Sequence, residues 1–477
     1  MDHSVGNDPK RAHALAKQMI QDIVAGSLGA DAFLGREPVL LERYGVSRDT
    51  FREALRQLEW LGIVRTQRGA RGGVYVQPPN QSAVVNVLRD YIDFSQPGFG
   101  DLLAVRRVLE QELLHAAIAR LEDRDIVRLR ILQGQFQRDM SREHFVMLLF
   151  RFYRQLMDIA DNEVITLSLM PLLFVTVDLA NFETLSDSAF ADNSERAWHT
   201  LSALLDELIG GNVVAASGLL LRFLDFTGAS VPDQIAALHN AESYPDWFDA
   251  RRNKLARGLI YRIHQDIRRS GCQQGDHLGT EAELMARYDV SRNTFREACR
   301  VLEVVGLVAV QKGRDGGLKV AQPRPDNAIS AVVYYLNAVK VSYLSLTRVR
   351  NAVELAAVPA AVSSLSDQAA EHLTELLAVQ KAVVGDKRFA AAAIATQKAM
   401  IRYCGNPIMI FYYDALLDSI YYRDQGAVAL TRLMEHAEPI TASQSVIIDA
   451  MLHRDRALAR RRVLQHHAAI EKYVGSM

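Results

Sequence analysis

The chain carries an internal duplication. The segment from Val46 to Ala54 returns 244 positions later as Val290 to Ala298, with a single change, Asp49 against Asn293. Over the longer stretch 46–73, 17 of 28 residues are identical to their counterparts in the second copy. Such a chain must fold as two copies of the same modules in the same order. A structural interpretation of one copy can therefore be checked against the other.

Length and composition set the broad class of protein. A chain of 477 residues is too long for one core, and two repeats with a small and a larger module each predict four domains. Hydrophobic residues make up 49% of the chain, but no apolar run approaches the roughly 18 residues that a membrane span needs. The first residues show no export pattern, and the three cysteines show no CxxC spacing. We therefore expect a soluble protein of the cytoplasm.

Each copy begins with a small module in which we expect three helices. Apolar residues at helical spacing predict one helix from Arg11 to about Ala25 and a second from about Glu37 to Tyr44. The second helix is followed by Gly45 in one copy and by Asp289 in the other, and both tolerate the left-handed backbone of a tight turn. This arrangement predicts a helix-turn-helix.

The third helix separates a core face from a charged face. Ser47 and Ser291 stand where the N-cap of this helix is expected. In the first copy Phe51, Leu55 and Leu58 fall on one face and point to the core. The opposite face carries Arg48, Arg52, Arg56 and Glu59.

After the third helix the apolar period changes to that of strands. Residues 63–67 and 74–76 are typical of two short strands, and the Gly-rich turn 68–73 joins them as a β-hairpin. The second copy has a similar turn at 312–317. Three helices and a basic-tipped hairpin make a winged helix-turn-helix, which we expect in each half.

Such a module is suited to DNA. The N-terminal end of a recognition helix enters the major groove, where arginine reads guanine bidentately and Ser, Thr and backbone N–H groups bind phosphate. Because Asp49 accepts a bond only from a base donor, whereas Asn293 can pair with adenine, we expect the copies to read different half-sites. Retention of Ser-Arg-x-Thr-x-Arg in both copies favours DNA binding over a merely structural helix.

Segments 46–73 and 290–317 resemble the winged-helix domain of GntR-type bacterial transcriptional regulators, with the pattern VSR-x-x-[VF]-R-E-A-L followed by a Gly-rich wing. The resemblance implies double-stranded operator DNA as the partner. Together, the helix chemistry and the resemblance assign DNA contacts to one set of residues in the two copies. These are Ser47, Arg48, Thr50, Arg52, Arg68, Gly69, Ser291, Arg292, Asn293, Thr294, Arg296, Lys312 and Gly313.

A larger module follows each small one. From about Asp101 to Phe226 and from Ser345 to Val474, apolar residues recur at helical spacing, which predicts an all-α bundle of six or seven helices. Each bundle opens with an arginine and a glutamate one helical turn apart, which can pair. These are Arg106 with Glu110 and Arg350 with Glu354.

The position of these pairs resembles the opening helix of the FadR-type C-terminal domains of the GntR regulators. The resemblance implies an effector or dimerisation module, with a small organic acid or acyl effector and a homodimer as further partners. Many such domains bind a divalent metal through an Asp and three His. The matching slots hold Leu149 and Tyr153 in one copy and Ala393 and Gln397 in the other, so we expect no metal and no cofactor. The candidate effector-pocket residues are Arg106, Tyr153, Arg350, Gln397 and His466.

The expected fold is mainly α. We predict winged helices at 1–79 and 247–324, all-α domains at 80–230 and 325–477, and a linker at 231–246. No spacing of nucleophile, base or phosphate loop argues for an enzyme. We expect a transcriptional regulator whose single chain acts as an intramolecular pseudo-dimer on an imperfect palindrome, associated with the nucleoid. The alternative is a ligand-sensing or protein-interaction scaffold that has lost DNA binding.

Overall fold

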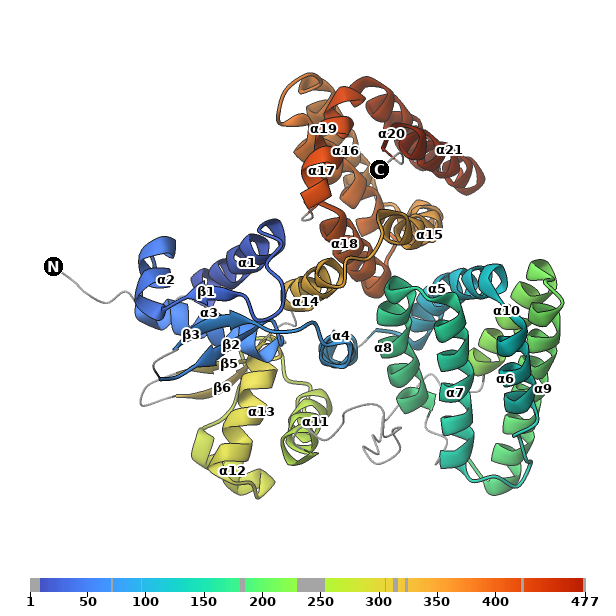
Figure 1. Ribbon diagram of the computed structural model, residues 1–477, viewed down its shortest axis with the longest axis horizontal. Helices are drawn as coiled ribbons and strands as arrows, with labels where there is room; N and C mark the ends of the chain where they lie inside the picture. Colours follow the sequence, from blue (N-terminus) through green and yellow to red (C-terminus); the bar gives the residue numbers. More distant parts are fainter. Residues whose placement is uncertain are drawn as a thin grey trace.

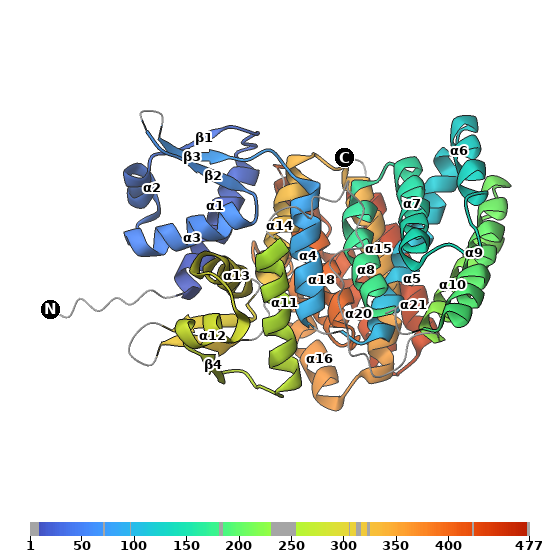
Figure 2. The same ribbon diagram turned by 90° about the horizontal axis from the view of Figure 1, so that it is seen from below.

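The structure is a computed structural model, and it is mainly helical. Both winged helices lie on one side of the molecule and the helical bundles on the other (Figures 1 and 2). Within the described part of the chain, no helix is both long and apolar enough to cross a membrane. The structure describes residues 9–69, 72–95, 97–180, 185–229, 254–304, 306–311, 316–321, 325–421 and 424–474.

Each half begins with the predicted winged helix. The helices and the hairpin are confirmed, but a further short strand, β1 or β4, completes a three-stranded antiparallel sheet in each module. The first module comprises α1 Pro9–Ala25, β1 Phe33–Gly35, α2 Glu37–Tyr44, α3 Arg48–Trp60, β2 Val64–Gln67 and β3 Gly73–Val76. The second comprises α11 Lys254–Arg269, β4 His277–Gly279, α12 Glu281–Tyr288, α13 Arg292–Val304, β5 Val308–Gln311 and β6 Gly317–Val320.

The turn between the second and third helices has the predicted backbone in both copies. Gly45 has φ 62° and Asp289 has φ 51°, so both residues lie in the left-handed region. The end of the second helix is also tied to the first helix, since the Tyr44 hydroxyl donates to Asp22 Oδ2 at 2.8 Å. This bond recurs in the second copy between Tyr288 and Asp266 at 2.7 Å. The two modules therefore share their local construction.

The helical bundles follow, and each is joined to its winged helix by a linking helix, α4 Gln81–Ser95 or α14 Pro325–Ala338. Helix α9 of the first bundle aligns with residues 431–453, where the second bundle has the end of one helix and then another, with a break near His436. The first bundle comprises α5 Phe99–Arg120, α6 Asp123–Gln133, α7 Arg142–Ala160, α8 Glu163–Ala180, α9 Asp187–Ile209 and α10 Val213–Ala229. The second comprises α15 Tyr343–Ser364, α16 Asp367–Ala382, α17 Phe389–Arg402, α18 Pro407–Tyr421, α19 Asp424–Glu435, α20 Ala437–Leu452 and α21 Arg456–Val474.

The two bundles pack on each other, and the contacts are reciprocal. Helix α5 packs on its counterpart α15 and α4 on its counterpart α14, while the contact of α5 with α18 is matched by that of α15 with α8. The Tyr412 hydroxyl donates to the Ser168 carbonyl at 2.6 Å, and these two residues occupy equivalent positions in the repeat. Such pairing of equivalent elements is the mark of an isologous interface, formed here within one chain.

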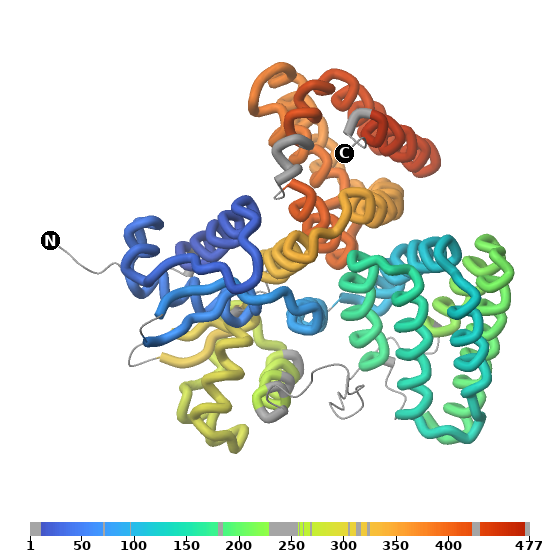
Figure 3. Tube along the Cα trace, viewed as in Figure 1, coloured from blue at the N-terminus to red at the C-terminus, as the bar shows by residue number. Residues whose placement is uncertain are grey.

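The linking helices cross between the halves. Figure 3 follows the chain from the blue winged helix through the first bundle to the yellow winged helix and the second bundle. Phe94, at the end of α4, is buried in the core of the second winged helix, with its ring centroid 4.8 Å from that of His264 on α11. In turn α14 packs on α1, and Tyr334 of α14 donates to the Gln77 carbonyl at 2.5 Å. Each linking helix therefore supports the winged helix of the other half.

Candidate functional site

The recognition helix of the first copy presents two arginines held by one glutamate. Glu37, in the first turn of α2, places Oε1 3.1 Å from Nε of Arg48 and 3.3 Å from Nε of Arg52. Both arginine side chains remain more than half exposed, at 63% and 53%. We call this set of two arginines and one glutamate an arginine clamp. It holds two guanidinium groups side by side at the start of the recognition helix.

The second copy builds the same clamp. Glu281 Oε1 lies 3.0 Å from Nε of Arg292 and 3.1 Å from Nε of Arg296. The two hydrogen-bonding arginines lower the pKa of the Glu281 carboxyl, so it stays ionised. Sequence reasoning missed the glutamate in both copies, although its recurrence in the first turn of the second helix was a readable signal.

The start of each recognition helix is fixed by a hydroxyl pair. Ser47 Oγ accepts from the backbone N–H of Thr50 at 3.2 Å, and the two hydroxyls lie 2.9 Å apart. Ser291 and Thr294 repeat both distances. Thr50 is buried whereas Thr294 is half-buried. Beside each pair stands the one position of the motif that differs, exposed in both copies: Asp49 and Asn293.

The wing is anchored to the recognition helix. Glu59, expected on the charged face, accepts at Oε1 from the backbone N–H of Thr66 at 3.0 Å, and Glu303 does the same for Val310 at 3.0 Å. Arg68 and Gly69 are exposed at the end of the first hairpin, where Gly69 has φ 99°. Lys312 and Gly313, predicted at the second wing, lie outside the described residues.

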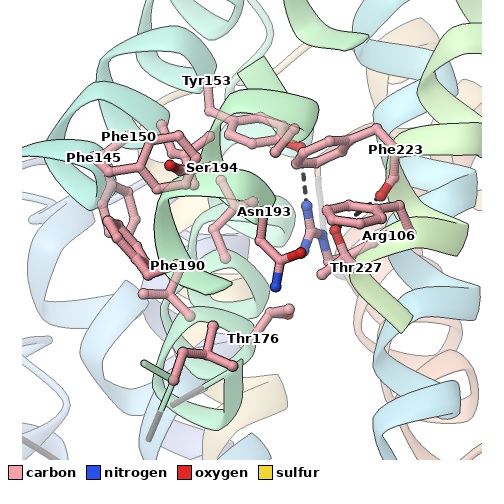
Figure 4. A pocket seen from close by; sticks show the side chains of 16 residues that line it. Arg106, Phe145, Phe150, Tyr153, Thr176, Phe190, Asn193, Ser194, Phe223 and Thr227 are labelled. Carbon is pink, nitrogen blue, oxygen red and sulfur yellow. Dashed lines mark hydrogen bonds between the residues drawn. The ribbon is translucent and has the colours of Figure 1, made fainter. Parts of the chain in front are cut away.

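The first helical bundle contains a cavity of about 70 Å³ (Figure 4). Arg106 and Tyr153, both predicted for an effector pocket, line it. Its wall is dominated by aromatic rings from α7, α9 and α10. These are Phe145, Phe150, Tyr153, Phe190, Phe223 and Phe226.

Arg106, Glu110 and Tyr153 form a closed hydrogen-bonded set, which we call the Arg106 triad. Arg106 Nε donates to Glu110 Oε1 at 2.6 Å and Nη2 donates to the Tyr153 oxygen at 2.9 Å, while the Tyr153 hydroxyl donates to Glu110 Oε2 at 2.8 Å. All three side chains are buried. Burial raises the pKa of Glu110 against the lowering effect of Arg106 and Tyr153, and it also raises the pKa of Tyr153. The opposite charges of Arg106 and Glu110, with a neutral phenol, leave the triad without net charge.

The second bundle has a smaller cavity of about 20 Å³, lined by the predicted Arg350, Gln397 and His466. Here the expected pairing of Arg350 with Glu354 is wrong. Glu354 instead accepts from His467 Nε2 at 3.1 Å and from Gln397 Nε2 at 3.3 Å. Arg350 turns to Asn351, with Nη2 2.5 Å from Oδ1.

The cause lies in two substitutions between the copies. The counterparts of Gln397 and His467 in the first half are Tyr153 and Phe223. Because Gln397 and His467 supply two donors to Glu354, they take the place that the arginine holds in the first half. Helical spacing permits the arginine–glutamate pair in both copies, and the neighbouring helices decide whether it forms.

Two groups of the second cavity have strongly shifted acidity. Burial alone would raise the pKa of Glu354, but the hydrogen bond from His467 and the charge of Arg350 lower it to about 2. Burial lowers the pKa of His466 to about 4, and its Nδ1 lies 2.7 Å from Ser443 Oγ. At neutral pH the carboxylate is therefore ionised and the His466 imidazole is neutral.

The lining of neither cavity fits a zinc-type ion. Leu149 and Tyr153 line the first cavity and Ala393, Gln397 and His466 the second, so the positions of the expected ligands carry mostly groups that do not bind metal. Across the described residues, no three His, Cys, Asp or Glu side chains lie together as a metal site.

Comparison with known proteins identifies the families that match the winged helices and the helical bundles. The family of bacterial regulatory proteins named gntR matches residues 11–76 and 255–315, and the FCD domain matches residues 101–226 and 345–469. The HTH-type transcriptional repressor NanR of Cronobacter sakazakii is 29% identical over 223 residues, which are 45% of this chain and 83% of that protein. NanR of Salmonella typhimurium is 28% identical over 223 residues, covering 45% of this chain and 82% of that protein.

A solved structure, Streptococcus agalactiae GntR, is similar over 46% of this chain and 99% of its own, with 17% identity and a TM-score of 0.34. The two NanR proteins each match about half of the chain, in keeping with its duplication. The chain belongs to the GntR family of bacterial regulatory proteins and is a transcriptional regulator that holds two winged helices and two FCD domains in tandem.

Proposed function

We propose that one chain binds an operator of two half-sites by itself, as an intramolecular pseudo-dimer. Reciprocal packing of α5 on α15 and of α4 on α14 supports this proposal, because it brings two equivalent bundles together as separate subunits of a dimer would. Both winged helices lie on the same side of the molecule (Figure 2). Once one winged helix has bound DNA, covalent linkage raises the effective concentration of the second winged helix to the order of mM. No subunit association is then needed before DNA is bound.

The twin arginine clamps support the DNA contacts that we propose. Each clamp holds two guanidinium groups at a helix start, where arginine can read guanine O6 and N7. We assign base contacts to both clamps and to Asn293, and phosphate contacts to the hydroxyl pairs and wings. The clamp arginines are Arg48, Arg52, Arg292 and Arg296; the other contacts are Ser47, Thr50, Arg68, Gly69, Ser291, Thr294, Lys312 and Gly313.

The preferred operator in this proposal is an imperfect palindrome. Asp49 and Asn293 occupy the same exposed position with different hydrogen-bonding capacity, so the two half-sites differ there. The half-sites lie about 10 base pairs apart or a multiple of that, because both readers approach one face of the duplex. The NanR relatives are named repressors, and we extend repression to this chain. A chromosomal operator places the protein at the nucleoid in the cytoplasm.

In the same proposal the helical bundles receive a small molecule that alters DNA binding. The buried cavities, with Arg106 and Tyr153 in one and Arg350, Gln397 and His466 in the other, support this assignment. The linking helices α4 and α14 join the bundles to the winged helices and provide the physical connection.

Gel shifts test whether each winged helix contacts DNA through its arginine clamp. The probe is the DNA upstream of the protein's own gene, after footprinting has defined the protected segment. Arg52→Ala and Arg296→Ala should each cost about 1–3 kcal/mol in operator affinity, because each removes one bidentate contact. Arg124→Ala, which removes an exposed arginine of the first bundle, is the matched control and should leave affinity unchanged. Unchanged binding in either clamp variant at physiological salt would show that its half does not read DNA.

Light scattering of the protein–DNA complex tests the assembly. We expect one chain on a two-half-site duplex, and loss of affinity when half a helical turn is inserted between the half-sites. A complex that always contains two chains, or indifference to the insertion, would rule out the pseudo-dimer and favour a homodimer of chains.

A further inference from the structure

We propose that the cavity of the first bundle selects an uncharged, mainly apolar ligand built around a ring, and excludes carboxylates. The proposal deepens the proposed function, since it names the ligand class of the effector site, and it rests on that function only for the effect on DNA. Three features of the molecule support it: the walls of the cavity, the charge of the Arg106 triad and the contrast with the second cavity.

The walls favour a ring. Six aromatic side chains face the cavity from three helices, and aromatic rings pack against one another in offset or edge-to-face geometry. The serine and threonine hydroxyls in the wall are already used within their own helices. Thr176 donates to the Leu172 carbonyl at 2.6 Å, and Thr227 donates to the Phe223 carbonyl at 2.9 Å. The lining therefore offers apolar surface with few free donors.

The triad excludes a negative charge. In the part of the lining that the structure describes, Arg106 is the only cationic side chain, and Glu110 already neutralises it at 2.6 Å. A carboxylate in the cavity would share this arginine with Glu110, leaving two negative charges against one positive charge in a buried apolar site. Burial of such an excess charge is strongly unfavourable. An uncharged molecule leaves all three bonds of the triad in place.

Two polar groups remain for recognition: Asn193, and the N–H groups of Arg106 outside the triad, which uses two of the five. Among the described residues of the lining, Asn193 carries the only side-chain amide; it is partly exposed, and Figure 4 shows it beside Arg106 and Thr227. An amide both donates and accepts, so it can meet a hydroxyl, carbonyl or amide on the ligand. The ligand class is thus an aromatic or alicyclic ring with a single uncharged polar substituent.

The second cavity does not compete for this ligand. Its volume of about 20 Å³ is close to what a single water molecule needs, and Arg350, Gln397 and Gln444 line it. Binding should therefore have a stoichiometry of one molecule per chain.

Calorimetric titration of the full chain without DNA tests the ligand class. Matched probes of nearly equal shape are benzamide against benzoate, and cyclohexanol against cyclohexanecarboxylate. We expect at least one uncharged probe to bind once per chain, and at least about tenfold more tightly than its carboxylate partner. Ala197→Leu, which places a larger side chain in the cavity wall, should abolish binding. Ala393→Leu, in the wall of the second cavity, is the matched control and should not change it.

Glu110→Gln tests the charge argument directly. This substitution leaves Arg106 uncompensated, so the preference should reverse in favour of benzoate. The proposal is overturned if wild-type protein prefers a carboxylate or binds none of the probes. It is equally overturned if Ala197→Leu binds like the wild type. Because the titration contains no DNA, its failure would leave the clamp arginines as readers, and failure of the gel shifts would leave the titration valid.

Discussion

The two halves of the chain have nearly identical arginine clamps but different cavities. The arginine clamps agree within a few tenths of an ångström, with contacts of 3.1 and 3.3 Å in the first half and 3.0 and 3.1 Å in the second. The cavities differ, because Glu110 binds Arg106 whereas Glu354 binds His467 and Gln397. Two readers on one duplex must fit the same groove, whereas two cavities need not meet the same molecule. Duplication within one chain thus allows the cavities to diverge while the surface that we propose for DNA is retained.

The largest predicted difference between the two halves concerns the stability that Phe94 gives to one winged helix. Its ring fills the core of the second winged helix, while its counterpart in the second half is Ala338 and supplies no ring to the first. Phe94→Ala should cost about 3–5 kcal/mol of local stability in the second winged helix only. Hydrogen exchange of α11 against α1 measures this difference. Tyr334→Phe, which removes the bond to Gln77 beside the first winged helix, is the control. Equal losses in both modules would contradict the crossed packing.

The next effect is a pH dependence confined to the second bundle. The folded state lowers the pKa of His466 to about 4, whereas an unfolded histidine titrates near 6.5. The unfolded chain binds more protons between these values, so this stabilisation is complete above about pH 6.5 and falls as the pH drops toward 4. The loss should be on the order of 2 kcal/mol by pH 5. In the first half the counterpart of His466 is the exposed Arg222, which is not a histidine.

Hydrogen exchange of α21 and α10 at pH 7 and pH 5, corrected for intrinsic rates, checks this prediction. His466→Gln should remove most of the pH dependence in α21. Glu354, with its pKa lowered to about 2, adds a further loss only below about pH 4.5, where the unfolded glutamate takes up its proton. A pH response of equal size in both bundles would contradict the assignment to His466.

A smaller predicted effect tests whether the arginine clamps of the two winged helices act in the same way. Glu37→Gln and Glu281→Gln each release two arginines and remove a negative charge beside the DNA phosphates. Each should strengthen binding to nonspecific duplex and reduce discrimination for the operator by about 1 kcal/mol. Competition titrations with operator and random duplex measure both quantities, and Glu375→Gln on the exposed side of α16 is the control. Clearly different effects in the two halves would show that the clamps are not equivalent.

The smallest effect comes from the one difference within the motif. Asp49→Asn gives the first half the same sequence as the second at this position, and it should improve operator affinity by under about 1 kcal/mol. Selection from duplexes with randomised half-sites should then yield a more symmetric operator than the wild-type chain selects. If the selected half-sites do not change, position 49 does not contact bases.

The local construction of the winged helices could be predicted from sequence. The second helix was expected from about Glu37 to Tyr44 and has these bounds, and the left-handed turn was expected at Gly45 and Asp289. Strand β1 was not predicted, because Phe33–Gly35 is too short to show alternation and pairs with a strand about 40 residues away. Spacing within a segment specifies helices and tight turns, whereas strand pairing depends on a distant partner.

Arrangements that depend on neighbouring helices were harder to predict. The spacing of Arg350 and Glu354 permits a pair, but donors from α17 and α21 take the carboxylate instead. The break between α19 and α20 occurs where the first half continues as one helix. Pro439, in the first turn of α20, has no N–H to continue the hydrogen bonds of α19, and it was a readable signal for this break. The crossing of α4 and α14, by contrast, leaves no local signal, since an apolar helix face packs equally well on either winged helix.

The crossed linking helices have a consequence for the history of this chain. Phe94 completes an apolar core that belongs to the other repeat, so a mutation that deleted the first repeat would leave a hole in the second winged helix. Each copy now covers apolar surface of the other copy and keeps that surface from solvent. Once such an exchange is in place, loss of either copy carries a folding penalty for the remaining one. The stability of the winged helices themselves then favours retention of the duplication, even while the two cavities evolve apart.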